Sequence, residues 1–221
     1  MNKFYLVPLP IGNLKDISLR ALETLKKVDF ILAEKPKKTL KLLNYFGIKK
    51  SVYPFFEFKN EKYLKIAITQ VKEGKSVSFV PEAGTPGISD PGKKLINELL
   101  KNNIKIESLP GPSVLSLILS LSDFRSKEAV FYGFLPKKKR SKIKKRIIHD
   151  LKNKRELVFF FSPFRLKKDL EFLKEINDSK ILLLKEATKI NEKVFRGKIS
   201  KILKEIEKEP IKGEWAGLIS L

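Results

Sequence analysis

The sequence predicts an α/β protein made of two domains, at 1–110 and 111–221. Three observations lead to this prediction. The chain has 221 residues, 42% of them apolar, which allows one large domain or two smaller ones at roughly 150 residues per domain. Short β-rich segments alternate with segments of helical periodicity, a pattern typical of sheets covered by helices. A Pro-Gly-Pro sequence at 110–112 interrupts this alternation near its middle and favours a domain junction there.

The first domain is predicted to contain five strands. They are segments rich in β-branched and aromatic residues, at 4–9, 30–33, 52–55, 77–80 and 104–107. Apolar residues at helical spacing predict an amphipathic crossover helix over 17–28, with Asp16 able to cap its start. A second helix is predicted over 63–71, because Glu73 and Gly74 follow it as a helix end.

The second domain repeats the alternation. Strands are predicted at 130–134, 157–161, 181–184 and 216–220, and helices over 166–176 and 199–206. Between the first two of these strands, the segment 137–155 holds eleven basic residues and one acid, Asp150. We expect this segment to form a helix that is basic nearly all round. Such a helix either binds an RNA backbone or is the solvated surface of a lysine-rich protein.

The charge of the chain favours an anionic partner. There are 47 Lys and Arg residues against 25 Asp and Glu, which gives a net charge of +22. This exceeds what solubility requires of a chain of this size. Forty of the basic residues are Lys, a bias that a genome poor in G and C also produces, so the charge alone does not decide the partner.

Several classes of protein are not supported by the composition. The chain has no cysteine, which excludes disulfides, thiolate metal sites and a cysteine nucleophile. The N-terminal sequence lacks the apolar core of a signal peptide, and no uninterrupted run of about 18 apolar residues occurs. We therefore expect a cytoplasmic protein that does not contact a membrane. No GxGxxG follows a strand, and neither GxxxxGK[ST] nor HExxH is present, so dinucleotide, P-loop and zinc-protease sites are not supported.

Three loops rich in glycine and proline follow predicted strands. The longest, PEAGTPGISDPG at 81–92, has twelve residues, whereas an ordinary turn between a strand and a helix needs roughly two to six. The others are PLPIGN at 8–13 and LPGPS at 109–113. Glycine lets backbone approach a ligand closely, and ligands bind at the carboxyl ends of strands in open α/β sheets. We expect the three loops to converge on one edge and to bind a ligand there.

Sequence blocks that span nearly the whole chain carry a resemblance to a known family. In order, they are VPLPIGNLKDISLRALETLKKVDFILAE, AGTPGISDPG, LPGPS, GFLP, SPFRL, the pair Thr188-Lys189 and the terminal GEWAGLISL. With these blocks the sequence resembles the RsmI family of ribosomal RNA methyltransferases, which belongs to the tetrapyrrole methylase superfamily.

The resemblance has implications for fold, cofactor and substrate. It implies two α/β domains of the tetrapyrrole methylase type, with S-adenosylmethionine in the cleft between them, and a homodimer. It also implies 2′-O-methylation of a cytidine in the decoding region of small-subunit (16S) ribosomal RNA, free or within the 30S subunit. Methyl transfer from a sulfonium to an oxygen needs alignment of the reacting atoms and no metal ion.

The matching blocks also imply a set of cofactor-binding residues. They are Pro10, Ala83, Gly84, Thr85, Ile88, Ser113, Val114, Phe161, Ala187, Ala216 and Leu218. Ala216 and Leu218 fall where backbone groups are expected to hold adenine.

Glu34 and Arg165 are the candidates for catalytic roles. A ribose hydroxyl is a weak nucleophile, so a base or a cation beside the developing alkoxide would help. Glu34 ends a predicted strand, where partial burial would raise its pKa. Arg165 begins a predicted helix and could contact RNA phosphate or orient the ribose. The alternatives are a surface acid paired with Lys35 and a solvated arginine.

RNA contacts are predicted from the basic segment and from one earlier position. The residues are Asn60, Lys137, Lys138, Lys139 and Arg140.

Departures from the usual residues of the family leave two other functions open. They are Lys35, Pro81, Phe161 and Phe164, all at or near the presumed site. One alternative is methylation of another acceptor, such as a tetrapyrrole, although an apolar bowl would suit that substrate better than a basic rim. The other is an RNA-binding or ribosome-assembly protein with a weakened active site.

Overall fold

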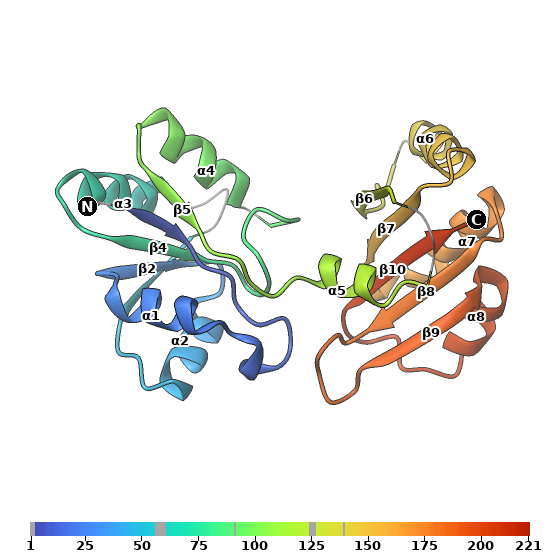
Figure 1. Ribbon diagram of the computed structural model, residues 1–221, viewed down its shortest axis with the longest axis horizontal. Coiled ribbons are helices and arrows are strands. Elements are labelled where there is room, and N and C mark those ends of the chain that lie inside the picture. Colours follow the sequence, from blue (N-terminus) through green and yellow to red (C-terminus); the bar gives the residue numbers. More distant parts are fainter. Residues whose placement is uncertain (1–2, 56–60, 91, 124–126, 139) are drawn as a thin grey trace. The chain divides into compact units, whose positions relative to one another are not determined.

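Figure 1 shows the computed structural model of the chain, which describes residues 3–55, 61–90, 92–123, 127–138 and 140–221. The chain divides into two compact units, Met1–Ser113 (unit 1) and Val114–Leu221 (unit 2). Each unit contains a five-stranded sheet with helices packed on it, which confirms the predicted α/β fold class. Residues 111–113, which the predicted boundary assigned to the second domain, belong to unit 1 because they pack against its other loops.

The sheet of unit 1 is parallel throughout, in the order β3-β2-β4-β1-β5. Its strands are β1 (Phe4–Leu6), β2 (Phe30–Ala33), β3 (Ser51–Pro54), β4 (Val77–Val80) and β5 (Ile106–Ser108). All residues of β2 and β4 are buried, as expected for strands covered on both faces. The five strands that the sequence predicted are present. β1 is shorter than predicted, because after Leu6 the chain enters the first of the three loops.

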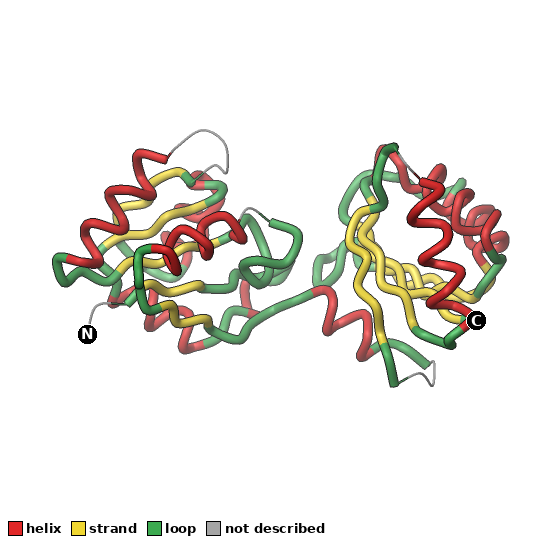
Figure 2. The backbone as a smooth tube through the Cα atoms, turned by 90° about the horizontal axis from the view of Figure 1, so that it is seen from above, coloured by secondary structure: helices red, strands yellow, loops and turns green. Residues whose placement is uncertain are grey.

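Helices cover both faces of this sheet. α1 (Leu19–Lys27) and α2 (Pro36–Tyr45) lie on one face, and α3 (Glu61–Lys72) and α4 (Gly92–Lys101) lie on the other (Figures 1 and 2). Neighbouring residues of β4 show the two layers, since Phe79 packs with apolar residues of α3 and α4, and Val80 with those of α1 and α2. β1 therefore leads to a helix on one face and β4 to a helix on the other.

The start of α1 differs from the prediction. Asp16 is not the cap, because it ends a short 3-10 turn, η1 (Leu14–Asp16). Ile17 then takes an extended backbone conformation and buries its side chain. This places Ser18 at the helix start, where its hydroxyl accepts a hydrogen bond from the N–H of Ala21 at 3.1 Å, the usual role of an N-cap serine.

The sheet of unit 2 is mixed, in the order β6-β7-β10-β8-β9. Its strands are β6 (Ala129–Phe134), β7 (Glu156–Phe161), β8 (Lys180–Lys185), β9 (Lys193–Lys198) and β10 (Trp215–Ser220). β6 and β7 are parallel, and the other neighbours are antiparallel. β9 was not predicted. It lies at the sheet edge, and all six of its residues are exposed or half-buried, so it lacks the apolar run by which the other strands were found.

Three helices of unit 2 pack on one face of its sheet. They are α6 (Arg140–Lys152), α7 (Leu166–Ile176) and α8 (Ile199–Ile206), while α5 (Val114–Ser120) lies against β10 (Figure 2). α7 and α8 begin and end where the sequence predicted. The expectation that α6 is basic nearly all round was wrong, because Ile147 and Leu151 pack in the core. α6 is an amphipathic helix whose basic residues occupy its solvent side.

A buried acid of α6 fastens this helix to the sheet. The Asp150 carboxylate accepts hydrogen bonds from the Tyr132 hydroxyl at 2.6 Å and from Arg155 Nη1 at 3.0 Å, and Arg146 Nε lies 3.9 Å away. Burial alone would raise the pKa of Asp150, but the hydrogen bonds from Tyr132 and Arg155 outweigh it and lower that pKa. Burial and the bond to Asp150 raise the pKa of Tyr132.

Replacing Asp150 with Asn should lower the free energy of unfolding by about 2 kcal/mol at neutral pH, because Arg155 and Tyr132 lose a buried charged partner. A carboxyl group whose pKa is lowered by folding stabilises the protein above its unfolded pKa. The difference between the two proteins should therefore shrink as the pH falls below about 4. Urea unfolding across this pH range measures it.

The control for this variant is Asp123→Asn. Asp123 also pairs with an arginine, Arg196, at 3.2 Å, but its side chain is exposed. Exposed pairs contribute little, so this variant should change stability much less. Equal losses in the two variants would contradict the role given to Asp150.

Candidate functional site

The three loops predicted to converge do meet at the carboxyl edge of the unit 1 sheet. Leu9 and Gly84 form a backbone bridge, with N–H···O distances of 3.0 and 2.9 Å in the two directions. The Thr85 hydroxyl donates to the carbonyl of Pro112 at 3.1 Å. Since β1 and β4 are neighbours whose chains continue to helices on opposite faces, this junction lies at the switch point of the sheet, where ligands bind in open α/β folds.

Two glycines of these loops are required by geometry. Gly84 has a φ of 74°, a conformation that glycine adopts readily and other residues rarely adopt. A Cβ on Gly84 would lie 3.4 Å from Ile11 Cγ2 and 3.7 Å from the carbonyl oxygen of Pro112. At Gly111 a Cβ would lie 2.2 Å from Pro8 Cγ, so no side chain fits there. The loops therefore meet where glycine backbone lies close to its neighbours, Gly84 against the Leu9 backbone and Gly111 against the Pro8 ring.

The second half of the long loop is fixed by one carboxylate. Asp90 accepts hydrogen bonds from the N–H of Gly87, at 2.9 Å to each oxygen, and from the N–H of Gly92 at 2.7 Å. Asp90 thus ties the loop to the first residue of α4. Ala83, Thr85 and Ile88, three of the predicted cofactor residues, lie in this loop and are half-buried.

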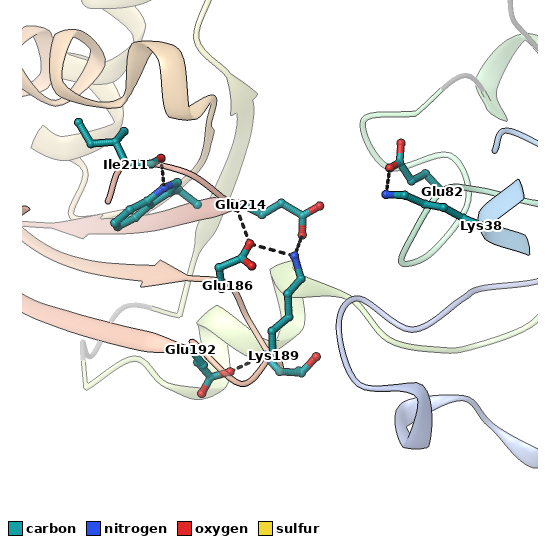
Figure 3. A network of polar contacts seen from close by, with 9 residues as sticks. Lys38, Glu82, Glu186, Lys189, Glu192, Ile211 and Glu214 are labelled. Carbon is teal, nitrogen blue, oxygen red and sulfur yellow. Dashed lines mark hydrogen bonds and ion pairs between the residues drawn. The ribbon is translucent and has the colours of Figure 1, made fainter. Parts of the chain in front are cut away.

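Glu34 lies at the same edge, directly after β2. Its carboxylate accepts a hydrogen bond from the N–H of Glu82 at 2.8 Å, so it contacts the long loop. Partial burial raises the pKa of Glu34, and the nearby carboxylates of Asp90 and Glu82 act in the same direction. The N–H of Glu82 and the charge of Lys35 oppose the shift but do not cancel it. Glu82 itself pairs with Lys38 (Figure 3).

In unit 2 the structure brings three predicted cofactor residues to one edge of the sheet. Phe161 ends β7 and pairs in register with Trp215 of β10, and Ala216 follows Trp215. Ala187 comes two residues after the end of β8, the other neighbour of β10. The side chains of Phe161 and Leu218 are buried in unit 2, so these two residues can offer only backbone to a ligand.

A charged network shapes the turn at Ala187, and the sequence did not single it out. Glu186 and Thr188 both have positive φ values, 51° and 62°. The Glu186 carboxylate accepts from the N–H of Glu214 at 2.8 Å and from Lys189 Nζ at 2.9 Å, and Lys189 also reaches the Glu214 carboxylate at 3.0 Å (Figure 3). Lys189 and Glu214 lie in the pair Thr188-Lys189 and the block GEWAGLISL, but the contact of both with Glu186 depends on the pairing of β8 with β10.

Protonation in this network follows the hydrogen bonds. Burial would raise the pKa of Glu186 and lower that of Lys189. The hydrogen bonds between these groups outweigh the effect of burial, so the pKa of Glu186 is lowered and that of Lys189 is raised. Both side chains therefore stay charged at neutral pH and hold the turn in its unusual backbone conformation.

Arg165 and Arg140 share one buried partner. Arg165 Nη2 donates to the Asp169 carboxylate at 2.9 Å, and Arg140 pairs with the same oxygen. Arg165 also donates to the carbonyls of Leu135 at 3.1 Å and Pro136 at 3.4 Å.

The remaining predicted site residues are spread over both units. Lys137 and Lys138 are exposed beside Pro136, and Pro10 is buried in the first loop of unit 1. Ser113 and Val114 are half-buried at the junction of the units. Asn60 and Lys139 lie outside the described residues.

Two kinds of feature are not found. Within the described ranges, no three side chains of His, Asp or Glu gather as they would around a metal ion. No helix in the same part of the chain has both the length and the apolar character needed to cross a bilayer.

Comparison with known proteins defines the family. The family model of the Tetrapyrrole (Corrin/Porphyrin) Methylases matches residues 3–203. Among solved structures, a diphthine synthase is similar with a TM-score of 0.73 and 16% identity, over 98% of this chain and 89% of the other. Uroporphyrin-III C-methyltransferase from Thermus thermophilus is similar with a TM-score of 0.67 and 19% identity, over 99% and 94%. The chain belongs to the tetrapyrrole methylase family.

Closer relatives place the chain within that family. A protein named Ribosomal RNA small subunit methyltransferase I from Thermotoga maritima is 41% identical over 100% of this chain and 99% of its own length. Proteins of the same name are 38% identical in Borrelia garinii, over 98% and 97%, and 39% identical in Streptococcus pyogenes, over 95% and 73%. The chain groups with these relatives, which confirms the resemblance found in its sequence blocks.

We expect the pKa of the Glu34 carboxyl to lie above the ordinary value for glutamate, because burial raises it. Replacing Lys35 with Met removes a neighbouring positive charge and should raise the pKa of Glu34 further. Lys37→Met, a matched change at an exposed lysine, should have a smaller effect. NMR titration of the Glu34 carboxyl in the original protein and in both variants measures these pKa values. A Glu34 pKa at or below the ordinary value in the original protein would contradict the burial argument.

Proposed function

We propose that this chain is an S-adenosylmethionine-dependent methyltransferase that modifies the 2′-hydroxyl of a cytidine in the decoding region of small-subunit ribosomal RNA. The observation that carries the proposal is the 41% identity, over the whole chain, to a relative named Ribosomal RNA small subunit methyltransferase I. The net charge of +22 supports a nucleic-acid substrate independently.

The geometry of both sheet edges supports the cofactor. At the unit 1 junction Gly84 pairs with Leu9 through backbone and leaves space that a side chain would fill. At the unit 2 edge, Ala187 and Ala216 carry small side chains beside paired strand ends. We propose that the residues predicted from the sequence blocks hold S-adenosylmethionine at these edges. When bound, this cofactor supplies a methyl group on a positively charged sulfur.

Glu34 is the proposed base. Its raised pKa makes it a stronger proton acceptor than an ordinary carboxylate. Its bond to the N–H of Glu82 orients it at the edge where the three loops meet. In this role the carboxylate takes the proton of the ribose hydroxyl as the oxygen becomes methylated.

Arg165 is assigned a positioning role. The sequence predicted that it contacts RNA or the ribose, but its guanidinium bonds with Asp169 and two carbonyls of unit 2. We propose that it holds the segment before α6, so that Lys137 and Lys138 face RNA. A homodimer and a cytoplasmic location, where small ribosomal subunits are found, complete the proposal.

The decisive test is transfer of a labelled methyl group from S-adenosylmethionine to small ribosomal subunits that lack this modification. We expect label on a single 2′-oxygen of a decoding-region cytidine, and a large loss of rate in Glu34→Gln. Label on a tetrapyrrole instead would favour the same fold with another acceptor. Binding of subunits without any transfer would favour a binding protein with a weakened site.

Replacing Gly84 with Leu should abolish binding of S-adenosylmethionine, because the new side chain enters the loop junction and φ is 74° there. Gly47→Leu is the matched control. Gly47 also has a positive φ, 65°, but nothing lies within 4 Å of its Cβ position, so this variant carries the backbone strain without touching the loops. Calorimetric titration with S-adenosylmethionine compares them, and equal affinities would contradict the assignment of the junction.

A further inference from the structure

Phe164 is an apolar side chain in an unusual setting. Its ring is 97% exposed on the 3-10 turn η2 (Pro163–Arg165), which follows β7. Single exposed apolar residues are common and need no explanation by themselves. Here the residues on either side are anchored, since Phe161 is buried and Arg165 is held by three hydrogen bonds. The ring therefore projects into solvent from a turn that is held firmly on both sides.

The same anchor connects this turn to the basic loop before α6. Arg165 donates to the carbonyls of Leu135 and Pro136, the two residues that precede Lys137. Arg140, at the start of α6, donates to the carbonyl of Pro136 at 3.4 Å and pairs with Asp169, as Arg165 does. Asp169 lies in the first turn of α7 and is buried. One carboxylate thus ties together the loop at 135–138, the start of α6 and the turn that carries Phe164.

The exposed positive charges of the loop at 135–138 come from lysine. All six arginines in the described part of the chain form ion pairs with acids. Asp169 pairs with both Arg140 and Arg165 and so offsets one of their two charges, whereas Lys137 and Lys138 are exposed. Lysine acts as a mobile point charge that suits a phosphate backbone without fixed geometry.

A second ring lies at the same end of the sheet. Phe134 ends β6, is 56% exposed and packs edge-on against Phe160 of β7, with ring centroids 5.7 Å apart. β6 and β7 are parallel neighbours, so Phe134 and the turn with Phe164 both lie at their carboxyl ends. Exposed rings beside free lysines are the combination by which proteins bind single-stranded nucleic acid, because bases stack on rings while lysines neutralise phosphates.

We propose that Phe164 is a stacking platform for an unpaired base of single-stranded RNA, whose phosphates are neutralised by Lys137 and Lys138. The inference deepens the proposed function and rests on it for the identity of the RNA. In this proposal the ion pairs of Asp169 with Arg140 and Arg165 preorganise the Phe164 ring and the two lysines for RNA binding.

The test measures affinity for a short fluorescein-labelled single-stranded RNA by anisotropy at several salt concentrations. Phe164→Ala should weaken binding about 5- to 150-fold and leave the salt dependence unchanged, since stacking involves no phosphate. The double variant Lys137→Ala/Lys138→Ala should instead reduce the log–log salt slope by about 1.4, or about 0.7 for each phosphate contact on a single strand. Tyr45→Ala, which removes an exposed ring from α2 of unit 1, is the control and should bind normally.

A second variant reports stacking directly. Phe164→Trp should keep the affinity, and its added fluorescence should be quenched by RNA, against a background of the single native Trp215, which is buried. Unchanged affinity in Phe164→Ala would overturn the proposal. Weaker RNA binding that is accompanied by dissociation of a dimer in sedimentation would also overturn it, because the ring would then be a contact between two copies of the chain.

Methyl transfer by the original protein, measured in parallel, separates the two proposals. If the original protein transfers the methyl group and Phe164→Ala binds RNA with unchanged affinity, only the stacking role is wrong. If the original protein transfers no methyl group but Phe164→Ala still binds RNA more weakly than it does, the enzymatic function is wrong and the stacking platform is supported.

Discussion

Gly84, which has a positive φ, forms a backbone bridge with Leu9. The two hydrogen bonds of this bridge join the loops that follow β1 and β4. These strands are neighbours, yet their chains continue to helices on opposite faces, so the loops would otherwise diverge. The bridge holds them together at the point where they separate. Pro112 and Glu34 contact the same long loop. The form of the unit 1 edge thus depends on one backbone contact that only glycine makes without strain.

Acidic residues are outnumbered by basic residues in this chain, and several of them serve as anchors. Asp150, Asp169 and Glu186 each accept hydrogen bonds from at least two partners, and each joins elements that are separate in the sequence. A buried carboxylate with several donors fixes geometry more strictly than apolar packing does, because an unpaired charge is costly there. Arg140, Arg155 and Arg165 are engaged in these contacts, whereas Lys137 and Lys138 are exposed and available to an anionic partner.

Much of the fold was predictable because buried strands are short apolar runs, and β2 and β4 were found at their observed bounds. α2 and α4 were missed because their apolar stripes are short and the preceding loops obscure their starts. Convergence of the loops followed from the rule for parallel strands. The contacts of Arg165 and Glu186 could not be predicted, since each depends on which strands and helices become neighbours, and a single sequence does not show that.

The position of β9 has a consequence for how the protein behaves among other chains. An open sheet edge is a template on which a strand of another molecule can pair, and this is a route to aggregation. β9 presents Lys193, Arg196 and Lys198 along that edge, and its side chains are largely in water. A second sheet docking there would have to strip water from these cations. The charged residues that make the strand hard to find in the sequence are therefore the ones that disfavour pairing at its edge.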